Sequence, residues 1–476
     1  MHTHHGKYKN IVLLRLSSPV IENVKHPRHC YPPIALKYIQ VLLINKGYLV
    51  KLIDAWVKPI FLDRFTSYII SLPVDVIVIY INTFVYEVSL KFINLIKKNK
   101  DILIIGIGQD VTAKPERYKL NDSPFDIILP GESECEIVEI IEKLNNGEPK
   151  EKIKGYYCLQ EELNIPTSPD LNKMPFLIWS KDELREYRFI YPLRVNKKVI
   201  CSYVISSRGC PYKCIFCSTA VRKSYGEKII LRDASKVVDE IENLTKFGVN
   251  VVSFEDDNFA ASRGHVISIC EEIKKRKLKI KWVSQVRIDG MDYDLLKMMK
   301  DAGCVLLLFG VESGSQRIIE LLKKTKSDIN WKEKANETFN LAKKAGIATC
   351  ALFIIGNPTE TENEVGESIQ LAKKLRPDLI KVHFFTPYSG SEAYKQFQNI
   401  INIDKELKMY HYGEPLVNVS NMSDKALKQK QREFYKNVLL DSNFILFHLK
   451  NYFIFYLYNW KTGIELIWKT FKFLLA

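Results

Sequence analysis

The chain has 476 residues, of which 46% are hydrophobic and 26% are charged. This balance excludes a largely disordered chain and is typical of a globular protein of two to four domains. The net charge of +15 fits a nucleic acid, an anionic membrane surface or a negatively charged substrate, and by itself favours none of them.

Cysteine usage and the first residues of the chain favour a reducing compartment. Residues 1–5 are polar and lack the apolar stretch of a secretory signal. Seven of the ten cysteines are scattered through apolar surroundings without paired spacing, as free thiols of the cytoplasm would be: Cys30, Cys135, Cys158, Cys201, Cys270, Cys304 and Cys350. We therefore expect a cytoplasmic protein.

The other three cysteines lie on one short loop at C-x3-C-x2-C spacing: Cys210, Cys214 and Cys217. Three thiolates so placed can hold three irons of a [4Fe-4S] cluster and leave the fourth iron open. A structural zinc site is the alternative. It needs a fourth ligand, and the nearest further thiol, Cys201, lies across a predicted strand.

This loop resembles the cysteine motif of the radical S-adenosylmethionine (radical SAM) superfamily, with Phe216 in the aromatic position and Gly209 before the first cysteine. The resemblance implies a cluster on Cys210, Cys214 and Cys217 whose open iron chelates SAM. Reductive cleavage of SAM would give a 5'-deoxyadenosyl radical that abstracts hydrogen from an unactivated carbon. A reductant protein such as ferredoxin or flavodoxin is then an expected partner.

Residues 8–150 alternate short apolar runs with amphipathic stretches. Continuous apolar strands with helices between them favour a doubly wound parallel sheet. Ligands bind such sheets at the carboxyl ends of the strands, here near residues 82–83, 106–108 and 130–132. The Rossmann dinucleotide fingerprint fails, because Gly106-x-Gly108 lacks its third glycine and does not follow the first strand. The predicted strands are 11–14, 49–53, 76–80, 102–106 and 127–129, and the predicted helices 33–47 and 87–99.

The layout resembles the cobalamin (B12)-binding domain that precedes the radical SAM barrel in one large subgroup. The likeness lies in residues 32–38, 47–55 and 106–134. It implies cobalamin contacts at Thr83, Gly106, Gly108, Gly131 and Glu132.

Two departures from that domain concern histidine. The usual Gly-Gly-x-His is here Gly106-Ile107-Gly108-Gln109, and no histidine occurs between His29 and His265. If cobalamin binds, no histidine of this domain ligates its cobalt. A sheet domain that kept the fold and lost the cofactor is the alternative.

Residues 151–200 contain four prolines and are interpreted as a linker. From there to residue 394 a strand-then-helix pattern repeats six times, which predicts an open six-fold barrel of the (β/α)6 type. A polar cluster follows each strand, and this edge is where a βα barrel carries its chemistry. The predicted strands are 204–206, 251–254, 281–285, 305–309, 347–355 and 379–384.

The polar clusters resemble the remaining family motifs, which implies SAM contacts. Residues 255–259 resemble the acidic motif that holds the SAM ammonium, and Arg287 matches an arginine placed to meet a carboxylate. Phe216 is a candidate for the adenine edge. The full set of predicted contacts is Phe216, Glu255, Asp257, Arg287, Glu312 and Ser313. The alternative is a solvated rim or helix caps, above all for Asp256, Asp257 and Ser313.

Two later motifs depart from the family pattern. Its G-x-P-G-E-T appears as residues 356–361, with Thr359 in place of the second glycine. Its P-x-P-G-T turn appears as residues 387–391, with Ser389 in place of the second proline. The substitutions put the local backbone shape in question.

Residues 396–476 are predicted to be helical. Trp460, Ile464, Ile467, Phe471 and Leu474 fall on one helical face, and Lys461, Glu465, Lys469 and Lys472 on the opposite one. No apolar run here reaches the roughly 18–20 residues of a membrane span. The helices therefore either pack on the barrel or form an amphipathic surface that sits on a membrane and meets a lipid-like substrate.

The sequence thus predicts an α/β protein with four parts: 1–150 cobalamin-binding, 151–200 linker, 201–395 radical SAM and 396–476 helical. The predicted reaction is cobalamin-dependent C-methylation of a small-molecule or lipid-like substrate, and radical C–C bond formation or cyclisation of a lipid or tetrapyrrole is the alternative. No catalytic acid, base or hydrogen donor stands out.

Two other classes of protein share some of these sequence features. A tRNA-modifying methylthiotransferase would use the positive charge, but it carries an N-terminal cysteine trio and a C-terminal β-barrel that this chain lacks, so nucleic acid is not the expected partner. A non-catalytic protein that retains a cluster is the other alternative.

Overall fold

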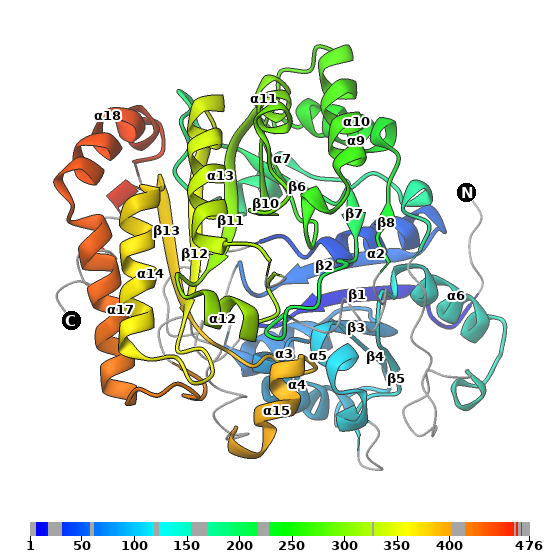
Figure 1. The fold of residues 1–476 in the computed structure, drawn as a ribbon. Coiled ribbons are helices and arrows are strands. Elements are labelled where there is room, and N and C mark those ends of the chain that lie inside the picture. The colour runs from blue at the N-terminus through cyan, green and yellow to red at the C-terminus, as the bar shows by residue number, and fades with distance from the viewer. Residues whose placement is uncertain are drawn as a thin grey trace. The chain divides into compact units, whose positions relative to one another are not determined.

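The computed structural model describes residues 6–17, 31–57, 61–118, 123–153, 169–187, 189, 191–217, 228–325, 328–401, 415–460, 463–464 and 468. The chain forms two compact units (Figure 1). The first comprises Met1–Arg188 with Ser218–Ile230 and Tyr388–Tyr410, and the second comprises Phe189–Cys217, Leu231–Pro387 and His411–Ala476. The four-part division of the chain stays a prediction.

The first unit is built on a five-stranded parallel sheet in the order β2-β1-β3-β4-β5. Helices α2 and α6 bury their apolar side chains against one face of this sheet, and α3 and α4 against the other. The doubly wound fold is thereby confirmed. Its strands are β1 (Asn10–Arg15), β2 (Leu49–Asp54), β3 (Val76–Tyr80), β4 (Leu103–Ile107) and β5 (Ile127–Leu129).

The helices of this unit follow the strands in alternation. They are α2 (Ile34–Asn45), α3 (Leu62–Ser71), η1 (Thr83–Val85), α4 (Tyr86–Lys97), α5 (Gln109–Ala113), η2 (Pro115–Tyr118) and α6 (Glu134–Asn145). The predicted linker holds only η3 (Lys150–Lys152), η4 (Leu171–Lys173) and α7 (Lys181–Glu186) in its described part. The later α15 (Glu392–Phe397) and η6 (Gln398–Ile400) also belong to this unit.

The second unit is built on a six-stranded parallel sheet in the order β13-β12-β11-β10-β9-β6. Six parallel strands in sequence order confirm the predicted partial barrel. They are β6 (Cys201–Val204), β9 (Val251–Phe254), β10 (Lys281–Arg287), β11 (Cys304–Glu312), β12 (Ala348–Ile355) and β13 (Leu379–Phe384). A two-stranded sheet joins β7 (Ser207–Arg208) to β8 (Ile230–Leu231).

Helices cover the outer face of the six-stranded sheet. Phe309 packs on Phe339 of α13, with ring centroids 5.1 Å apart, and Phe353 packs on Phe434 of α17 at 5.0 Å. The helices are α9 (Ala234–Lys246), η5 (Phe259–Ala261), α10 (Arg263–Lys275), α11 (Tyr293–Asp301), α12 (Gln316–Leu321), α13 (Trp331–Ala345), α14 (Glu362–Leu375), α17 (Asp424–Leu439) and α18 (Ser442–Tyr458).

The inner face of this sheet carries the alternate residues of each strand. Gly310 pairs with Leu352, Leu352 with Lys381, and Arg287 with Gly310, so these side chains point away from the helices that cover Phe309 and Phe353. Toward the carboxyl ends of β12 and β13 the inner residues Leu352, Ile354, Lys381 and His383 keep solvent-accessible surface, whereas the outer residues Phe353, Val382 and Phe384 are buried. The inner face is therefore not filled by its own side chains, unlike the packed interior of a closed eight-fold barrel.

The C-terminal part is largely helical where it is described, in α17 and α18, but residues 415–423 form neither helix nor strand. No helix in the described ranges is both long enough and apolar enough to cross a membrane. Of the predicted apolar face, Trp460 and Ile464 are exposed. Ile467, Phe471 and Leu474, and the lysine stripe Lys461, Lys469 and Lys472 with Glu465, lie outside the described residues.

Candidate active site

The three cysteines of the predicted cluster lie on the loop that follows β7. Cys214 is buried, Cys210 is partly buried and Cys217 is exposed. Burial raises the pKa of Cys210. Although Cys217 keeps exposed surface, the protein packed around its sulfur displaces water and, together with the neighbouring thiols, raises its pKa to about 12. The thiols are thus close enough to oppose one another's ionisation. A bound cation would reverse that preference, because thiolates are the metal ligands.

Two aspartates at the end of β9 hold the start of this loop. Asp256 accepts hydrogen bonds from the backbone N–H of Ser206 at 2.7 Å and from the hydroxyl of Ser207 at 2.8 Å. Asp257 accepts one from the N–H of Gly209 at 2.8 Å, where the backbone φ is +92°. Glycine adopts that φ without strain. The hydrogen bond to Asp257 then fixes the residue before Cys210 in place. The two carboxylates serve the cysteine loop, where a helix cap was the alternative.

Asp257 nevertheless keeps a carboxylate oxygen for other partners. It retains exposed surface, although surrounding protein raises the pKa of its carboxyl group. Glu255, next to these aspartates, is also exposed and accepts a hydrogen bond from the Ser253 hydroxyl at 2.8 Å. Although the Glu255 side chain keeps exposed surface, the protein packed around its carboxyl group displaces water and raises its pKa to about 7. The predicted role of Glu255 and Asp257 toward an ammonium group stays a prediction.

Arg287, at the end of β10, faces the cysteine loop. Its Nη1 lies 3.7 Å from Sγ of Cys214, and its guanidinium carbon lies 3.7 Å from the ring centroid of Tyr212. Its Nε and Nη2 donate to the two carboxylate oxygens of Asp289 at 2.9 and 2.6 Å. The guanidinium is therefore a fixed positive charge beside a cluster thiol, and its paired donors already serve a carboxylate of the chain.

A buried ion pair lies at the end of β11. Nζ of Lys324 donates to Oε1 of Glu312 at 2.6 Å, and the Lys324 ammonium lies 5.9 Å from the ring centroid of Phe216. Glu312 has φ +64°, at a bulge where the pairing with β12 shifts. A Cβ atom on Gly310 would lie 2.4 Å from the Glu312 carboxylate, so glycine at 310 leaves room for this pair. Sequence analysis missed Lys324, because nothing local marks it.

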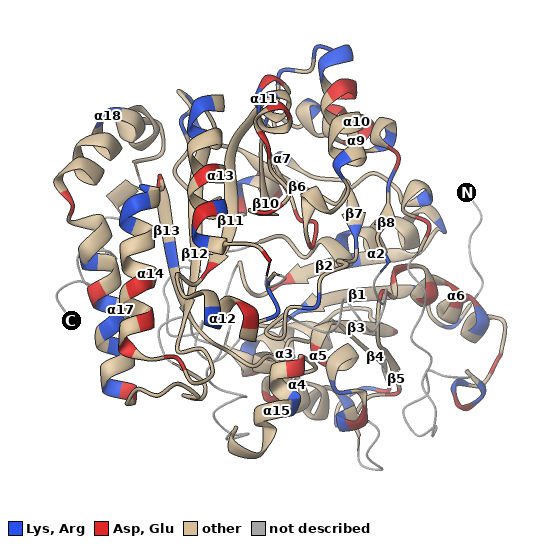
Figure 2. Ribbon diagram, viewed as in Figure 1, with Lys and Arg blue, Asp and Glu red and all other residues tan. Residues whose placement is uncertain are grey.

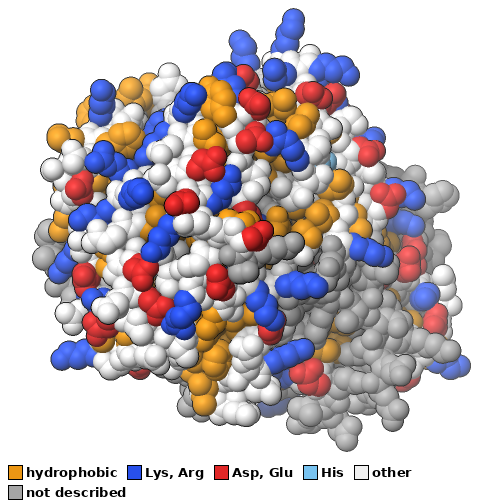
Figure 3. All heavy atoms as spheres, in the orientation of Figure 1, with side chains coloured by type: hydrophobic (Ala, Val, Ile, Leu, Met, Phe, Trp, Pro, Cys, Tyr) orange, Lys and Arg blue, Asp and Glu red, His pale blue; other side chains and the backbone are white. Residues whose placement is uncertain are grey.

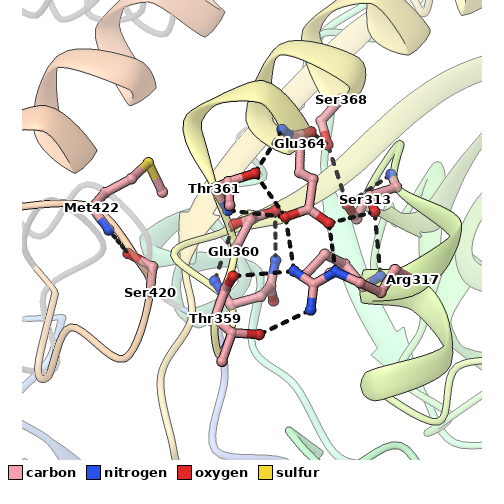
Figure 4. A network of polar contacts seen from close by, with 12 residues as sticks. Ser313, Arg317, Thr359, Glu360, Thr361, Glu364, Ser368, Ser420 and Met422 are labelled. Atoms are coloured by element: carbon pink, nitrogen blue, oxygen red, sulfur yellow. Dashed lines mark hydrogen bonds and ion pairs between the residues drawn. The ribbon is translucent and has the colours of Figure 1, made fainter.

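Ser313, a predicted SAM contact, lies in a buried polar network (Figure 4). Its hydroxyl accepts from the N–H of Ser315 at 3.1 Å and lies 3.3 Å from the hydroxyl of Ser368 on α14. The Ser315 hydroxyl donates to Glu364 at 2.9 Å. The Ser313 side chain thus ties the end of β11 to α14, and a contact with SAM stays a prediction.

The same network includes the motif whose second glycine is replaced by threonine (Figure 4). Thr359 keeps φ +58°, a left-handed conformation that suits glycine and strains a β-branched residue. Arg317 donates to the Thr359 hydroxyl at 2.9 Å and to its carbonyl at 3.1 Å. Arg317 is itself anchored by two hydrogen bonds to Glu364. The expected turn is therefore kept without its glycine.

Three of the five predicted cobalamin contacts lie at the carboxyl ends of the strands of the first unit. Its strand order places a topological switch point between β1 and β3, where ligands of such sheets bind. Thr83 begins η1 just after β3, and Gly131 follows β5 with its N–H donated to Thr112 at 2.8 Å. Gly108 follows β4 with φ +112°, and a Cβ there would lie 2.7 Å from the carbonyl oxygen of Ile81.

The other two predicted contacts differ in position. Gly106 is buried inside β4, and a Cβ there would touch the ring of Phe125 at 3.0 Å, so this glycine serves packing within the sheet. Glu132 is half-buried after β5. The edge itself, with turns at Gly108 and Gly131, fits a nucleotide-like cofactor, and no histidine occurs in the sequence between His29 and His265 to ligate a metal there.

The donor set of the second unit fits an iron–sulfur cluster. Three thiols share one loop, an arginine faces one of them, and no further cysteine follows on that loop. In the described ranges no three His, Cys, Asp or Glu side chains surround a point as ligands of a single metal ion. Cys304, one of the scattered cysteines, is fully buried at the amino end of β11, away from this edge.

Two family models match the chain. A model of the radical SAM superfamily matches residues 204–372, and a model of the B12 binding domain matches residues 23–140. Both fall on the unit where the corresponding site lies.

Known proteins similar to the chain agree with these matches. An uncharacterized methyltransferase of Pyrococcus horikoshii is 26% identical over 85% of this chain and 87% of its own length. An anaerobic magnesium-protoporphyrin IX monomethyl ester cyclase of Rubrivivax gelatinosus is 24% identical over 87% of this chain and 75% of its own length. A solved structure with the same fold is that of the radical SAM methyltransferase TsrM from Kitasatospora setae, with cobalamin and a [4Fe-4S] cluster bound. Its TM-score is 0.65, and it is 16% identical over 83% of this chain and 75% of its own.

The cysteine loop, the acidic and arginine groups at the strand ends and the parallel sheets thus agree with both family models. The chain carries a radical SAM domain, matched over residues 204–372, and a B12-binding domain ahead of it, matched over residues 23–140.

Proposed function

We propose that this protein is a cobalamin-dependent radical SAM enzyme that transfers a methyl group to an unactivated carbon. The observation that carries the proposal is the loop of Cys210, Cys214 and Cys217, held by Asp257 and faced by Arg287. Its similarity to a methyltransferase over most of both chains supports methylation. Similarity to a cyclase keeps ring closure as the second candidate.

A cluster on the three thiols, with SAM at its open iron and methylcobalamin in the first unit, would supply a hydrogen-abstracting radical and a methyl donor. The chain's own residues would position these groups. Arg287 offsets the negative charge that three thiolates bring to the loop. Glu255 and Asp257 offer exposed carboxylate oxygens suited to an ammonium group, and Phe216 offers an aromatic face beside Lys324.

We also propose that the substrate is lipid-like and that α18 meets a membrane surface. This helix buries Tyr452 and Phe455 and exposes most of its other large apolar residues: Ile445, Leu446, Phe447, Leu449, Phe453, Ile454, Leu457 and Tyr458. Its ribbon carries almost no charge, and apolar side chains gather over it (Figures 2 and 3). After residue 442 the chain has four lysines against one glutamate, which suits an anionic surface.

The proposed reaction is tested by anaerobic reconstitution with iron, sulfide and hydroxocobalamin. A cobalt absorption band that co-elutes with the protein would support cofactor binding by the first unit. Extracts of cells with and without the gene are then compared by mass spectrometry. A product heavier by one methyl group supports methylation, and one lighter by two hydrogens indicates ring closure. Protein that keeps no cobalamin would overturn the cobalamin part of the proposal.

The membrane proposal is tested by sedimentation of the full chain with phosphatidylcholine vesicles, with and without phosphatidylglycerol. Binding should need the anionic lipid and be lost when Leu446→Asp and Leu457→Asp are combined. Ile178→Asp is the matched control, because Ile178 is an exposed apolar residue outside α18. Equal sedimentation of the double variant and the control would contradict the proposal.

A further inference from the structure

Lys381 is a cation on the inner face of the second unit's sheet, and it has no carboxylate partner among the described residues. It lies on β13, and its ammonium donates to the hydroxyl of Tyr191 at 2.5 Å and lies 4.3 Å from the ring centroid of that tyrosine. In the described part of the chain no carboxylate lies within ion-pair distance of it. Burial lowers the pKa of the Lys381 ammonium, and a thiol, Cys350, is the one group whose charge would raise it.

The carboxylate just before β13 is engaged by other groups. Asp378, just before β13, pairs with Arg194 and accepts from the N–H of Thr349 at 2.9 Å and from the hydroxyl of Tyr452 at 2.8 Å. The charge of the Asp378 carboxylate is therefore balanced by Arg194 and is not available to Lys381. A partly buried ammonium without a counter-ion is costly unless an anion completes it.

A second basic group stands beside this lysine. His383 lies two residues further along β13, on the same inner face. Burial, and then the charge of Lys381, lower the pKa of His383 to about 4, so its ring is neutral near pH 7 and can serve as a hydrogen-bond partner without adding charge. Leu352 and Ile354, the partners of Lys381 and His383 on β12, are also partly exposed on this face. A polar pair thus borders an apolar surface.

Two of the predicted SAM contacts share the inner face. Arg287 shares it by register, and Glu255 continues the inner alternation of β9, where Ser253 pairs with Val283. Lys381, by contrast, belongs to the last strand, at the opposite edge of the sheet from β6 and β9. A molecule contacting both edges would be one that lies across the inner face.

We propose that Lys381, with Tyr191 and His383, forms a subsite that binds an oxyanion group of the substrate on the inner face of the sheet. This inference rests on the proposed function, because it assigns a substrate group to the enzyme's own barrel. A carboxylate or a phosphate would satisfy the same lysine, and the apolar part of the substrate would lie along Leu352 and Ile354. The substrate class is thereby an acidic molecule with an apolar portion.

The test measures binding, not turnover. Octyl phosphate, octanoate and 1-octanol are titrated into the full chain by calorimetry, with SAM absent. We expect saturable binding of one or both anions, weakened at least tenfold in Lys381→Met and Lys381→Gln, since a charge-assisted hydrogen bond is lost. Lys381→Arg should stay within about threefold of the native affinity. The anion that binds more tightly identifies the group as phosphate or carboxylate, and 1-octanol should show no dependence on residue 381.

Lys343→Met is the control matched for net charge. Lys343 lies on α13, on the outer side of the sheet, and its ammonium donates to the carbonyl oxygen of Leu375 at 2.7 Å. Anion affinity should not change in this variant. Two neutral replacements at 381 guard against misfolding of one of them, and thermal denaturation checks both.

Two results would overturn the subsite: no saturable binding of either anion to the native chain, or equal affinity in the Lys381→Met and Lys343→Met variants. Its failure is distinguishable from failure of the proposed function. SAM cleavage measured on the same preparations reports the cluster alone, so intact cleavage without anion binding rejects only the subsite. Anion binding without cleavage rejects only the proposed function.

Discussion

At the scale of single residues, Thr359 shows how a motif keeps its shape after losing its glycine. Its φ of +58° is strained for a non-glycine residue, and Arg317 holds both its hydroxyl and its carbonyl group. The backbone conformation is therefore set by a side chain 42 residues away. Alanine variants are usually more stable than glycine variants. At position 359 the left-handed conformation predicts the opposite order of stability.

Thr359→Gly should be more stable than Thr359→Ala by about 1 kcal/mol, because both lose the hydroxyl and only alanine keeps the left-handed strain. Urea denaturation of the two variants measures the difference. An alanine variant as stable as the glycine variant, or more stable, would show that position 359 does not hold this conformation.

The buried pair of Lys324 and Glu312 is a second feature at this scale. Both side chains are buried, and their charged atoms lie 2.6 Å apart. Removing one partner leaves the other as an unpaired buried charge, which commonly costs about 3–5 kcal/mol, whereas removing both charges costs far less.

Lys324→Met should therefore lower the free energy of unfolding by several kcal/mol, and adding Glu312→Gln should restore most of the loss. Denaturant titration of the single and double variants tests this coupling. Additive losses in the double variant would mean that the two charges do not depend on each other.

At the scale of elements, α18 carries a small aromatic cluster, and its Tyr452 donates a hydrogen bond to Asp378 beside β13. His448 stacks on Tyr452, with ring centroids 4.4 Å apart, and its Nε2 lies 2.8 Å from the hydroxyl of Tyr456. Burial lowers the pKa of His448 from 6.5 to about 4, with the charge of Asp378 opposing and that of Arg194 assisting the shift. The folded state therefore resists protonation of this ring.

The contribution of His448 to stability should fall as the pH drops below about 6.5, because the unfolded chain binds a proton on this ring first. The His448 contribution is absent above pH 6.5 and reaches about 2 kcal/mol of lost stability at pH 5. His448→Phe keeps a stacked ring without the titration, so its stability should depend less on pH across this range. Parallel pH profiles of unfolding for the variant and the native chain would contradict the assignment.

At the scale of the whole molecule, both parallel sheets could be predicted from sequence patterns. The strands are short apolar runs bounded by polar residues, and their parallel order follows from the helices between them. The cysteine loop could be found because its three ligands lie within eight residues. The polar groups after the strands share an edge for a topological reason, so Glu255, Arg287 and Glu312 could be named in advance.

Other site features could not be foretold, because they depend on contacts between distant segments. Lys324, Asp289 and the support of Gly209 by Asp257 become visible only once the loops are folded. The pairing of Lys381 with Tyr191 spans 190 residues. Ser313 was placed at the SAM site by its motif, whereas its hydroxyl is engaged in the network with Ser368. Motifs indicate which residues gather, and packing decides what each side chain faces.

The account as a whole depends on an iron of the cluster that no protein residue ligates. The most direct measurement is the amount of 5'-deoxyadenosine and methionine formed from SAM by the anaerobically reconstituted, reduced protein, with the metal content determined in parallel. We predict near-equimolar products for the native chain and for Cys304→Ala, a core cysteine control, and loss of both products and iron in Cys214→Ala. Undiminished products and metal content in Cys214→Ala, or zinc as the bound metal, would contradict the account.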